Sequence, residues 1–125
     1  MLANASIVAF APTRDQERAI KFYRGKLGLK LTSQDGFAAV FDAHGAMLRV
    51  TSVPEPLRPQ PFTILLGWKV ADIAETVRSL LSAGVTFERY PQIAQDEPGI
   101  WTAPGGAKVA WFKDPDGNIL SVTQF

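Results

Sequence analysis

Hydrophobic residues along the first half of the chain change from a strand-like to a helix-like spacing and back again. The apolar run at 5–11 stops at Pro12 and predicts a strand. A helix over 14–27 follows, with Thr13 and Gln16 as its capping pair and Gly28 as its end. Its apolar positions recur at helical spacing and are Ala19, Ile20, Tyr23 and Leu27.

Three further strands complete this half. Residues 29–33 and 37–41 read as a hairpin, because Asp35-Gly36 between them is a strong turn signal. Residues 46–53 form the next apolar run after a turn at 42–45. The first half is therefore expected to be βαβββ.

The pattern starts again after a proline-rich stretch at 54–61, which we interpret as an extended linker. A strand is expected at 63–70, and Asp72 with Glu75 predicts the start of a helix over 72–83. Later strands are expected at 85–88, 99–103, 107–112 and 119–125, with an irregular loop at 90–98. Residues 99–103 and 107–112 flank Pro104-Gly105-Gly106 as an interrupted hairpin. The second half then repeats the βαβββ order, with an insertion in its middle that accounts for the additional segment.

An internal repeat supports two equivalent halves. The segment DAHGAMLRVT at 42–51 matches DPDGNILSVT at 114–123, with coincident Asp, Gly, Leu, Val and Thr at an offset of 72. A repeated supersecondary unit implies two modules that bury one another. We expect one domain over 1–125, with module one at 1–53, the linker at 54–61 and module two at 62–125.

Composition excludes several function classes. The sequence has no cysteine, so disulfides and thiolate chemistry are absent. The net charge of +1 comes from mixed charges and gives no basic stripe for nucleic acid. No apolar run has the length of a membrane span, and the N-terminus lacks the pattern of a signal peptide. These features predict a cytoplasmic protein that binds neither nucleic acid nor membrane.

Three motifs, in this order and spacing, resemble the vicinal oxygen chelate superfamily of glyoxalases, bleomycin-resistance proteins and extradiol dioxygenases. They are AIKFYR at 19–24 with LGL at 27–29, VADI at 70–73, and DPDGN at 114–118. The resemblance covers essentially the whole chain. It implies an α+β fold in which two βαβββ modules form a curved eight-stranded cup with the helices outside and a ligand inside.

In metal-using members of that superfamily, each module supplies ligands from its first and last strands. Counted from the turn and cap residues, the four equivalent positions here hold Val8, Arg49, Leu65 and Ser121. None is an ordinary ligand of a divalent metal. The only histidine, His44, lies in a predicted turn. We therefore expect neither a metal nor another cofactor.

Strand alternation predicts the side chains that face the cup. The expected ligand-binding residues are Val8, Phe10, Met47, Arg49, Thr51, Leu65 and Ser121, with Trp101 near the mouth. Arg49 is out of place among apolar neighbours, and a buried guanidinium needs an anion. Either Glu88, Asp96 or Glu97 pairs with it, or it receives the carboxylate or phosphate of a ligand.

Two functional classes follow. The first is a metal-independent small-molecule-binding protein for a partly apolar compound that can carry an anionic group, assembled as a homodimer. The second is an enzyme of the same superfamily, a lyase, isomerase or dioxygenase with displaced metal ligands. The lack of a histidine in the predicted cup and of opposed carboxylates favours the first.

Overall fold

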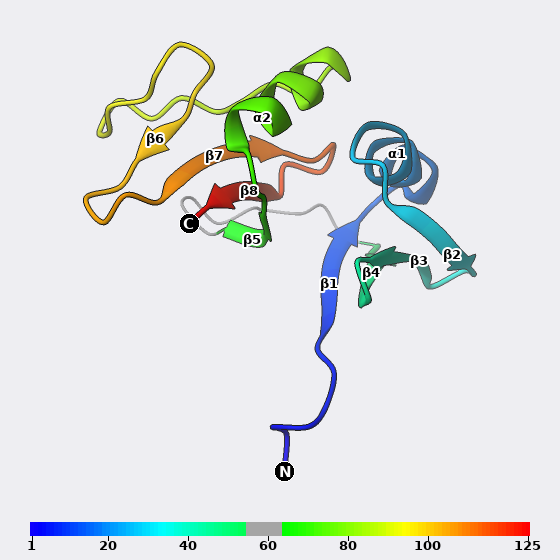
Figure 1. The fold of residues 1–125 in the computed structure, drawn as a ribbon. Helices are drawn as coiled ribbons and strands as arrows, with labels where there is room; N and C mark the ends of the chain where they lie inside the picture. Colours follow the sequence, from blue (N-terminus) through cyan, green and yellow to red (C-terminus); the bar gives the residue numbers. More distant parts are fainter. Residues whose placement is uncertain (55–63) are drawn as a thin grey trace. The chain divides into compact units, whose positions relative to one another are not determined.

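The computed structural model describes residues 1–54 and 64–125 (Figure 1). The chain divides into two compact units, Met1–Arg58 and Pro59–Phe125. Most of the predicted linker and the start of the predicted strand at 63 lie outside the described residues. Within the described part, no helix has both the length and the apolar character needed to cross a membrane.

The first unit is a four-stranded mixed sheet with a helical segment on one face. Strand β1 (Val8–Thr13) is followed by α1 (Gln16–Ile20), the π-helical turn η1 (Lys21–Lys26), β2 (Lys30–Gln34), β3 (Ala38–Ala43) and β4 (Ala46–Ser52). The spatial order is β1-β4-β3-β2, in which the β1/β4 pair is parallel and the other pairs are antiparallel. Helix α1 packs against β3 and β4.

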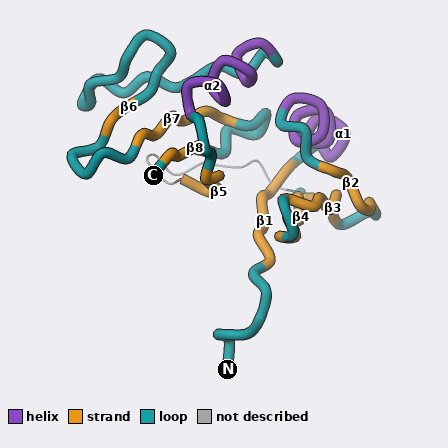
Figure 2. The backbone as a smooth tube through the Cα atoms, in the orientation of Figure 1, coloured by secondary structure: helices purple, strands orange, loops and turns teal. Residues whose placement is uncertain are grey.

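The second unit repeats this order with different lengths. Its elements are β5 (Ile64–Lys69), α2 (Ile73–Ser82), β6 (Trp101–Thr102), β7 (Lys108–Lys113) and β8 (Ile119–Gln124). The sheet order is β5-β8-β7-β6, again with one parallel pair, β5/β8. Helix α2 packs on β7 and β8. The tube in Figure 2 shows how much loop separates α2 from β6. The predicted α+β fold with two βαβββ modules is confirmed.

The internal repeat forms matching parts of the two cores. Leu48 and Val50 of β4 correspond to Leu120 and Val122 of β8, and all four side chains are buried. The glycines of the two repeated turns, Gly45 and Gly117, have φ of +89° and +84°. Only glycine adopts this left-handed conformation without strain, so the turn sequence fixes where each last strand begins.

The start of the first helix differs from the prediction. Asp15, not Thr13, is the N-cap, and its Oδ1 accepts the Arg18 N–H at 3.1 Å. The Thr13 side chain instead bonds the backbone of Asp15 and is fully buried. Gln16 is not part of a capping box, because its amide donates to Ser52 Oγ at 2.7 Å and to the Asp35 carbonyl. A carboxylate closer to the first turn displaces the weaker hydroxyl cap.

The predicted strand at 85–88 was wrong, and the strand at 99–103 is shorter than expected. Phe87 makes one isolated bridge with Phe112, and the Glu88 N–H donates to the Trp111 carbonyl at 2.7 Å. The rest of this edge of β7 pairs with β6, through Trp101 with Val109 and Thr102 with Lys108. Gly99, at φ +107°, and Pro104, which lacks an N–H, limit that strand.

Candidate functional site

The face of the second sheet opposite α2 carries two tryptophans, Trp101 of β6 and Trp111 of β7. Strand register places Gly67, Ser121 and Trp111 in one row across β5, β8 and β7. In the next row on the same face, two residues along each strand, Trp101 of β6 pairs with Val109, which pairs with Thr123. Because side chains alternate between faces, the two tryptophans lie on the same side of the sheet.

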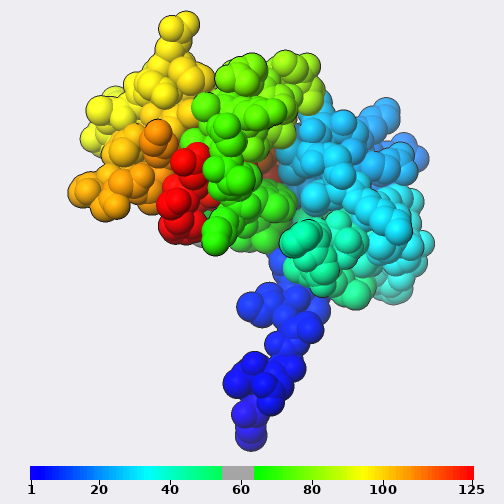
Figure 3. All heavy atoms as spheres, in the orientation of Figure 1, coloured from blue at the N-terminus to red at the C-terminus, as the bar shows by residue number. Residues whose placement is uncertain are grey.

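A pocket of about 380 Å³ opens on this face. Its walls come from β5, β6, β7, β8 and the segment that precedes β6, so it lies wholly within the second unit. The lining residues are Ile64, Tyr90, Gln92, Ile93, Trp101, Trp111 and Ile119. In Figure 3 that preceding segment, drawn in yellow, lies at the surface beside the orange β7.

Trp111 is the central ring of the pocket. The Tyr90 ring meets it nearly edge-on, with centroids 5.5 Å apart and an interplanar angle of 79°. The Trp101 ring lies 6.0 Å away and is tilted by 32°. Both arrangements are favourable for aromatic quadrupoles. The three rings therefore form a continuous wall suited to contact with a flat apolar molecule.

Residues 88–100, which we call the pocket loop, hold Tyr90 and Ile93 in place through a dense set of hydrogen bonds. The Gln95 side chain bonds the backbone of Tyr90, Glu88 and Gly99. Asp96 Oδ1 accepts the Gly99 and Ile100 N–H groups at 3.0 and 2.7 Å. The Arg89 guanidinium donates to the carbonyls of Asp96 and Glu97. The segment predicted to be an irregular loop is thus an organised wall.

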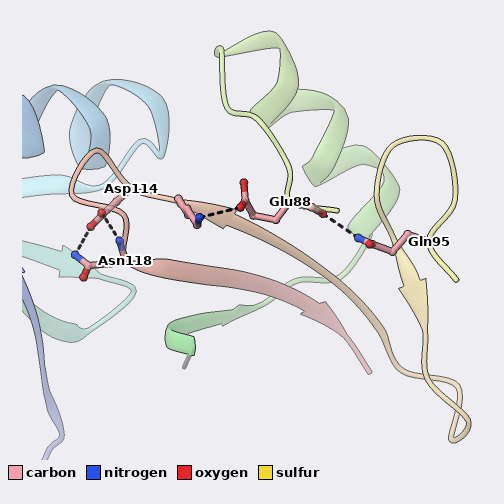
Figure 4. A network of polar contacts seen from close by, with 5 residues as sticks. Glu88, Gln95, Asp114 and Asn118 are labelled. Atoms are coloured by element: carbon pink, nitrogen blue, oxygen red, sulfur yellow. Dashed lines mark hydrogen bonds and ion pairs between the residues drawn. The ribbon is translucent and has the colours of Figure 1, made fainter. Parts of the chain in front are cut away.

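A charged pair of residues outside the pocket lining acts on Tyr90. Lys113 Nζ lies 3.2 Å from Glu88 Oε1 (Figure 4). Both charges influence the ionisation of Tyr90. Burial and then the Glu88 carboxylate raise the pKa of the Tyr90 phenol, while Lys113 lowers it. Tyr90 consequently presents a neutral hydroxyl, able to donate or accept a hydrogen bond, at neutral pH.

Residues 6–122 match the family model described as the Glyoxalase/Bleomycin resistance protein/Dioxygenase superfamily. The chain belongs to this superfamily. No curated protein sequence gives a significant match to it. The predicted family is thereby confirmed.

Solved structures of superfamily members share the fold. A member from Sphaerobacter thermophilus is 20% identical, with full coverage of both chains and a TM-score of 0.75. One from Alicyclobacillus acidocaldarius is 20% identical over 98% of this chain and 92% of that chain, with a TM-score of 0.74. Lactoylglutathione lyase from Agrobacterium tumefaciens is 19% identical over 98% and 95% of the two chains, also at 0.74. These similarities establish the architecture, not a shared reaction.

The predicted ligand-binding residues of the first unit share one sheet face. Phe10 and Val40 are the lateral neighbours of Arg49, and Val8 pairs with Met47. Phe10 is 56% exposed, and Arg49 is half-buried. Thr51, on the same face, has a buried hydroxyl that no group in the described part of the chain bonds.

The three acidic residues expected near Arg49 all belong to the second unit. Glu88 pairs with Lys113, and Asp96 caps the pocket loop. Within the first unit, the positive charge of Arg49 acts on the carboxyl group of Asp35. Its pKa is lowered, first by the Phe37 N–H, then by the Ala38 N–H, and least by Arg49.

The remaining predicted residues lie in the second unit. Trp101 lines the pocket, as its position near the expected mouth suggested. Leu65 lies at a register shift between β5 and β8, and Ile64 takes the lining position instead. Ser121 is 6% exposed, and a Cβ built on Gly67 would lie 2.8 Å from its Oγ.

The described residues contain no group of three or more His, Cys, Asp or Glu side chains arranged to hold a metal. The four positions equivalent to metal ligands hold Val8, Arg49, Leu65 and Ser121. His44 is exposed and has φ +53°, which agrees with its interpretation as a turn residue.

The sequence-based prediction did not assign Tyr90 or Trp111 to the site. Gln92 and Ile93 were missed altogether. The available signal was the insertion between Gly84 and β6, because an insertion next to a sheet edge can only pack against that edge or project from it.

Proposed function

We propose that this superfamily member is a metal-independent binding protein for a small, flat, largely apolar compound. The observation that carries the proposal is the wall formed by Tyr90, Trp101 and Trp111 around a pocket of about 380 Å³. Its volume is in the range of ligand pockets, and aromatic contacts contribute roughly 0.5–1.5 kcal/mol each beyond area burial.

The polar edge defines the rest of the ligand. The Tyr90 hydroxyl and the Gln92 amide offer both donors and acceptors. A compound with one polar substituent on a flat ring system would place that group here and its ring against Trp111. The pocket geometry therefore favours an aromatic alcohol or acid over an aliphatic chain.

The test has two stages. Native mass spectrometry of freshly purified protein searches for a retained compound, and calorimetry then measures binding of 2-naphthol as a defined probe. Trp101→Ala should weaken 2-naphthol binding about tenfold, since it removes one aromatic wall. Trp68→Phe is the matched control, because Trp68 pairs with the buried Val122 on the other side of the sheet.

Unchanged 2-naphthol affinity in Trp101→Ala, or equal losses in both variants, would contradict the proposed pocket. Absence of binding by the wild-type protein to 2-naphthol and to any co-purifying compound would contradict the function itself.

We also propose that the chain forms a homodimer. In the first unit Val8, Phe10 and Met47 are 41%, 56% and 43% exposed on one sheet face. Exposed apolar surface of this kind favours association with a second copy. Light scattering at micromolar concentration should give twice the chain mass; the mass of one chain at every concentration would oppose the proposal.

A cytoplasmic location remains a prediction that cell fractionation can check.

A further inference from the structure

The side chain of Gln95 makes three hydrogen bonds to three different backbone groups. Its Oε1 accepts the Tyr90 N–H at 2.7 Å, and its Nε2 donates to the carbonyls of Glu88 at 2.9 Å and Gly99 at 2.8 Å. Figure 4 shows the amide pointing from the pocket loop toward Glu88. A half-buried amide thus uses both donors and its acceptor within the chain.

These bonds connect the two ends of the pocket loop. Glu88 and Tyr90 belong to the strand-like entry beside β7, while Gly99 leads directly into β6. The backbone of Gln95 itself bridges Trp101. One residue therefore links the segment that carries Tyr90 to the strand that carries Trp101, on either side of Trp111.

We propose that Gln95 is the positioning residue of the pocket, holding Tyr90 and Trp101 at the separation that a flat ligand requires. The proposal rests on the proposed function for its ligand but concerns a residue that does not line the cavity. It predicts that the pocket is built before the ligand arrives, so little ordering of the loop opposes binding.

An amide is suited to this role in a way that its isosteres are not. Methionine has similar size but makes none of the three bonds. A glutamate carboxylate can still accept the Tyr90 N–H, yet it faces the carbonyl oxygens of Glu88 and Gly99 without a proton to share. When the glutamate is protonated, its O–H can donate to one of these two carbonyls. The effect of Gln95→Glu should therefore depend on pH.

The experiment compares Gln95→Met and Gln95→Glu with a control of similar kind. Asp35→Ala removes a side-chain acceptor of two backbone N–H groups, those of Phe37 and Ala38, from a turn in the first unit. Three quantities are measured for each protein: the melting temperature, the affinity for 2-naphthol and the near-ultraviolet circular dichroism of the Tyr90–Trp111–Trp101 rings.

Gln95→Met should weaken 2-naphthol binding tenfold or more and diminish the near-ultraviolet signal. Gln95→Glu should do the same at neutral pH and regain part of both as the pH falls toward about 4.3, the ordinary pKa of glutamate. The wild type, measured in parallel, should not gain affinity over this range. Asp35→Ala should lower the melting temperature while leaving affinity and the aromatic signal unchanged.

The proposal is overturned if Gln95→Met loses thermal stability but keeps wild-type affinity and aromatic signal, because Gln95 is then a structural residue alone. Failure of the wild type to bind 2-naphthol would be a failure of the proposed function. In that case the near-ultraviolet signal still tests the positioning role of Gln95 without a ligand. An altered signal in Gln95→Met upholds that role, and an unaltered signal rejects it.

Discussion

The amide of Asn118 donates to the carboxylate of Asp114 at 2.7 Å, and both side chains are almost fully buried (Figure 4). The other carboxylate oxygen accepts the N–H groups of Asp116 and Asn118 at 2.9 and 3.0 Å. Asp42 holds the equivalent place in the first unit, where it is exposed and accepts the Gly45 N–H at 3.1 Å. The two repeats keep the same turn with different degrees of burial.

Replacement of the two aspartates should therefore have unequal effects. Asp114→Ala should lower the free energy of unfolding by about 2–3 kcal/mol, because it leaves buried donors without a charged acceptor. Asp42→Ala should cost about 1 kcal/mol, since water can replace the lost acceptor. Denaturant unfolding of both variants measures the difference, and equal losses would contradict the role assigned to burial.

Gly67 should resist substitution because of one neighbouring atom. A Cβ at this position would lie 2.8 Å from Ser121 Oγ, too close without a shift of the serine. Overpacking costs roughly 1–3 kcal/mol, which exceeds the 0.4–1 kcal/mol that loss of glycine freedom contributes. Gly67→Ala should thus destabilise the protein, and Gly67→Ala combined with Ser121→Ala should recover stability. A destabilised double variant would mean that the clash is not the cause.

The two charges beside Tyr90 should change its ionisation in opposite directions. Glu88→Gln should lower the pKa of the phenol and Lys113→Met should raise it further. The raised pKa contributes stability that is complete below about pH 10 and is lost as the pH rises through the folded pKa. Titration of phenolate absorbance, with Tyr90→Phe subtracted, measures each shift. Shifts of the same sign in both variants would exclude the assigned electrostatics.

Arg49 is predicted to receive an anionic group of a compound bound on the face of the first sheet, beside Phe10. Arg49→Met should weaken binding of 2-naphthoate about tenfold, because a charge-assisted hydrogen bond contributes roughly 1.5–3 kcal/mol. Its melting temperature should match the wild type. Unchanged 2-naphthoate affinity with a lower melting temperature would instead identify Arg49 as half of a structural ion pair.

Metal removal should have no effect. With Val8, Arg49, Leu65 and Ser121 at the equivalent positions, stoichiometric zinc, nickel, iron or manganese is not expected. Elemental analysis and melting curves with and without a chelator test this. About one tightly held ion per chain, released together with stability, would refute the prediction.

The fold was predictable because its signals are local and duplicated. The turns at Asp42 and Asp114, the Asp35-Gly36 hairpin and the N-cap at Asp72 each depend on a few adjacent residues. The positions of the buried Leu120 and Val122 follow from simple alternation after such a turn.

The site was less predictable because it depends on contacts that spacing does not encode. The register shift beside Leu65 exchanges it for Ile64, and periodicity gives no sign of that shift. Tyr90 reaches Trp111 through the bonds of Gln95, whose side chain bonds residues up to seven positions away along an irregular backbone. A sequence pattern shows that Gln95 is polar but not which carbonyls it bonds.

The difference in length between the two connections that follow the helices has an evolutionary consequence. Leu29 alone separates Gly28 from β2, whereas residues 85–100 separate Gly84 from β6. The entropy of closing a loop grows only with the logarithm of its length, so such an extension adds little to the cost of folding. After duplication of an ancestral βαβββ unit, one copy could retain its short connection while the other acquired new residues at a sheet edge. Selection for different ligands could then act on that segment while the rest of the sheet stayed the same.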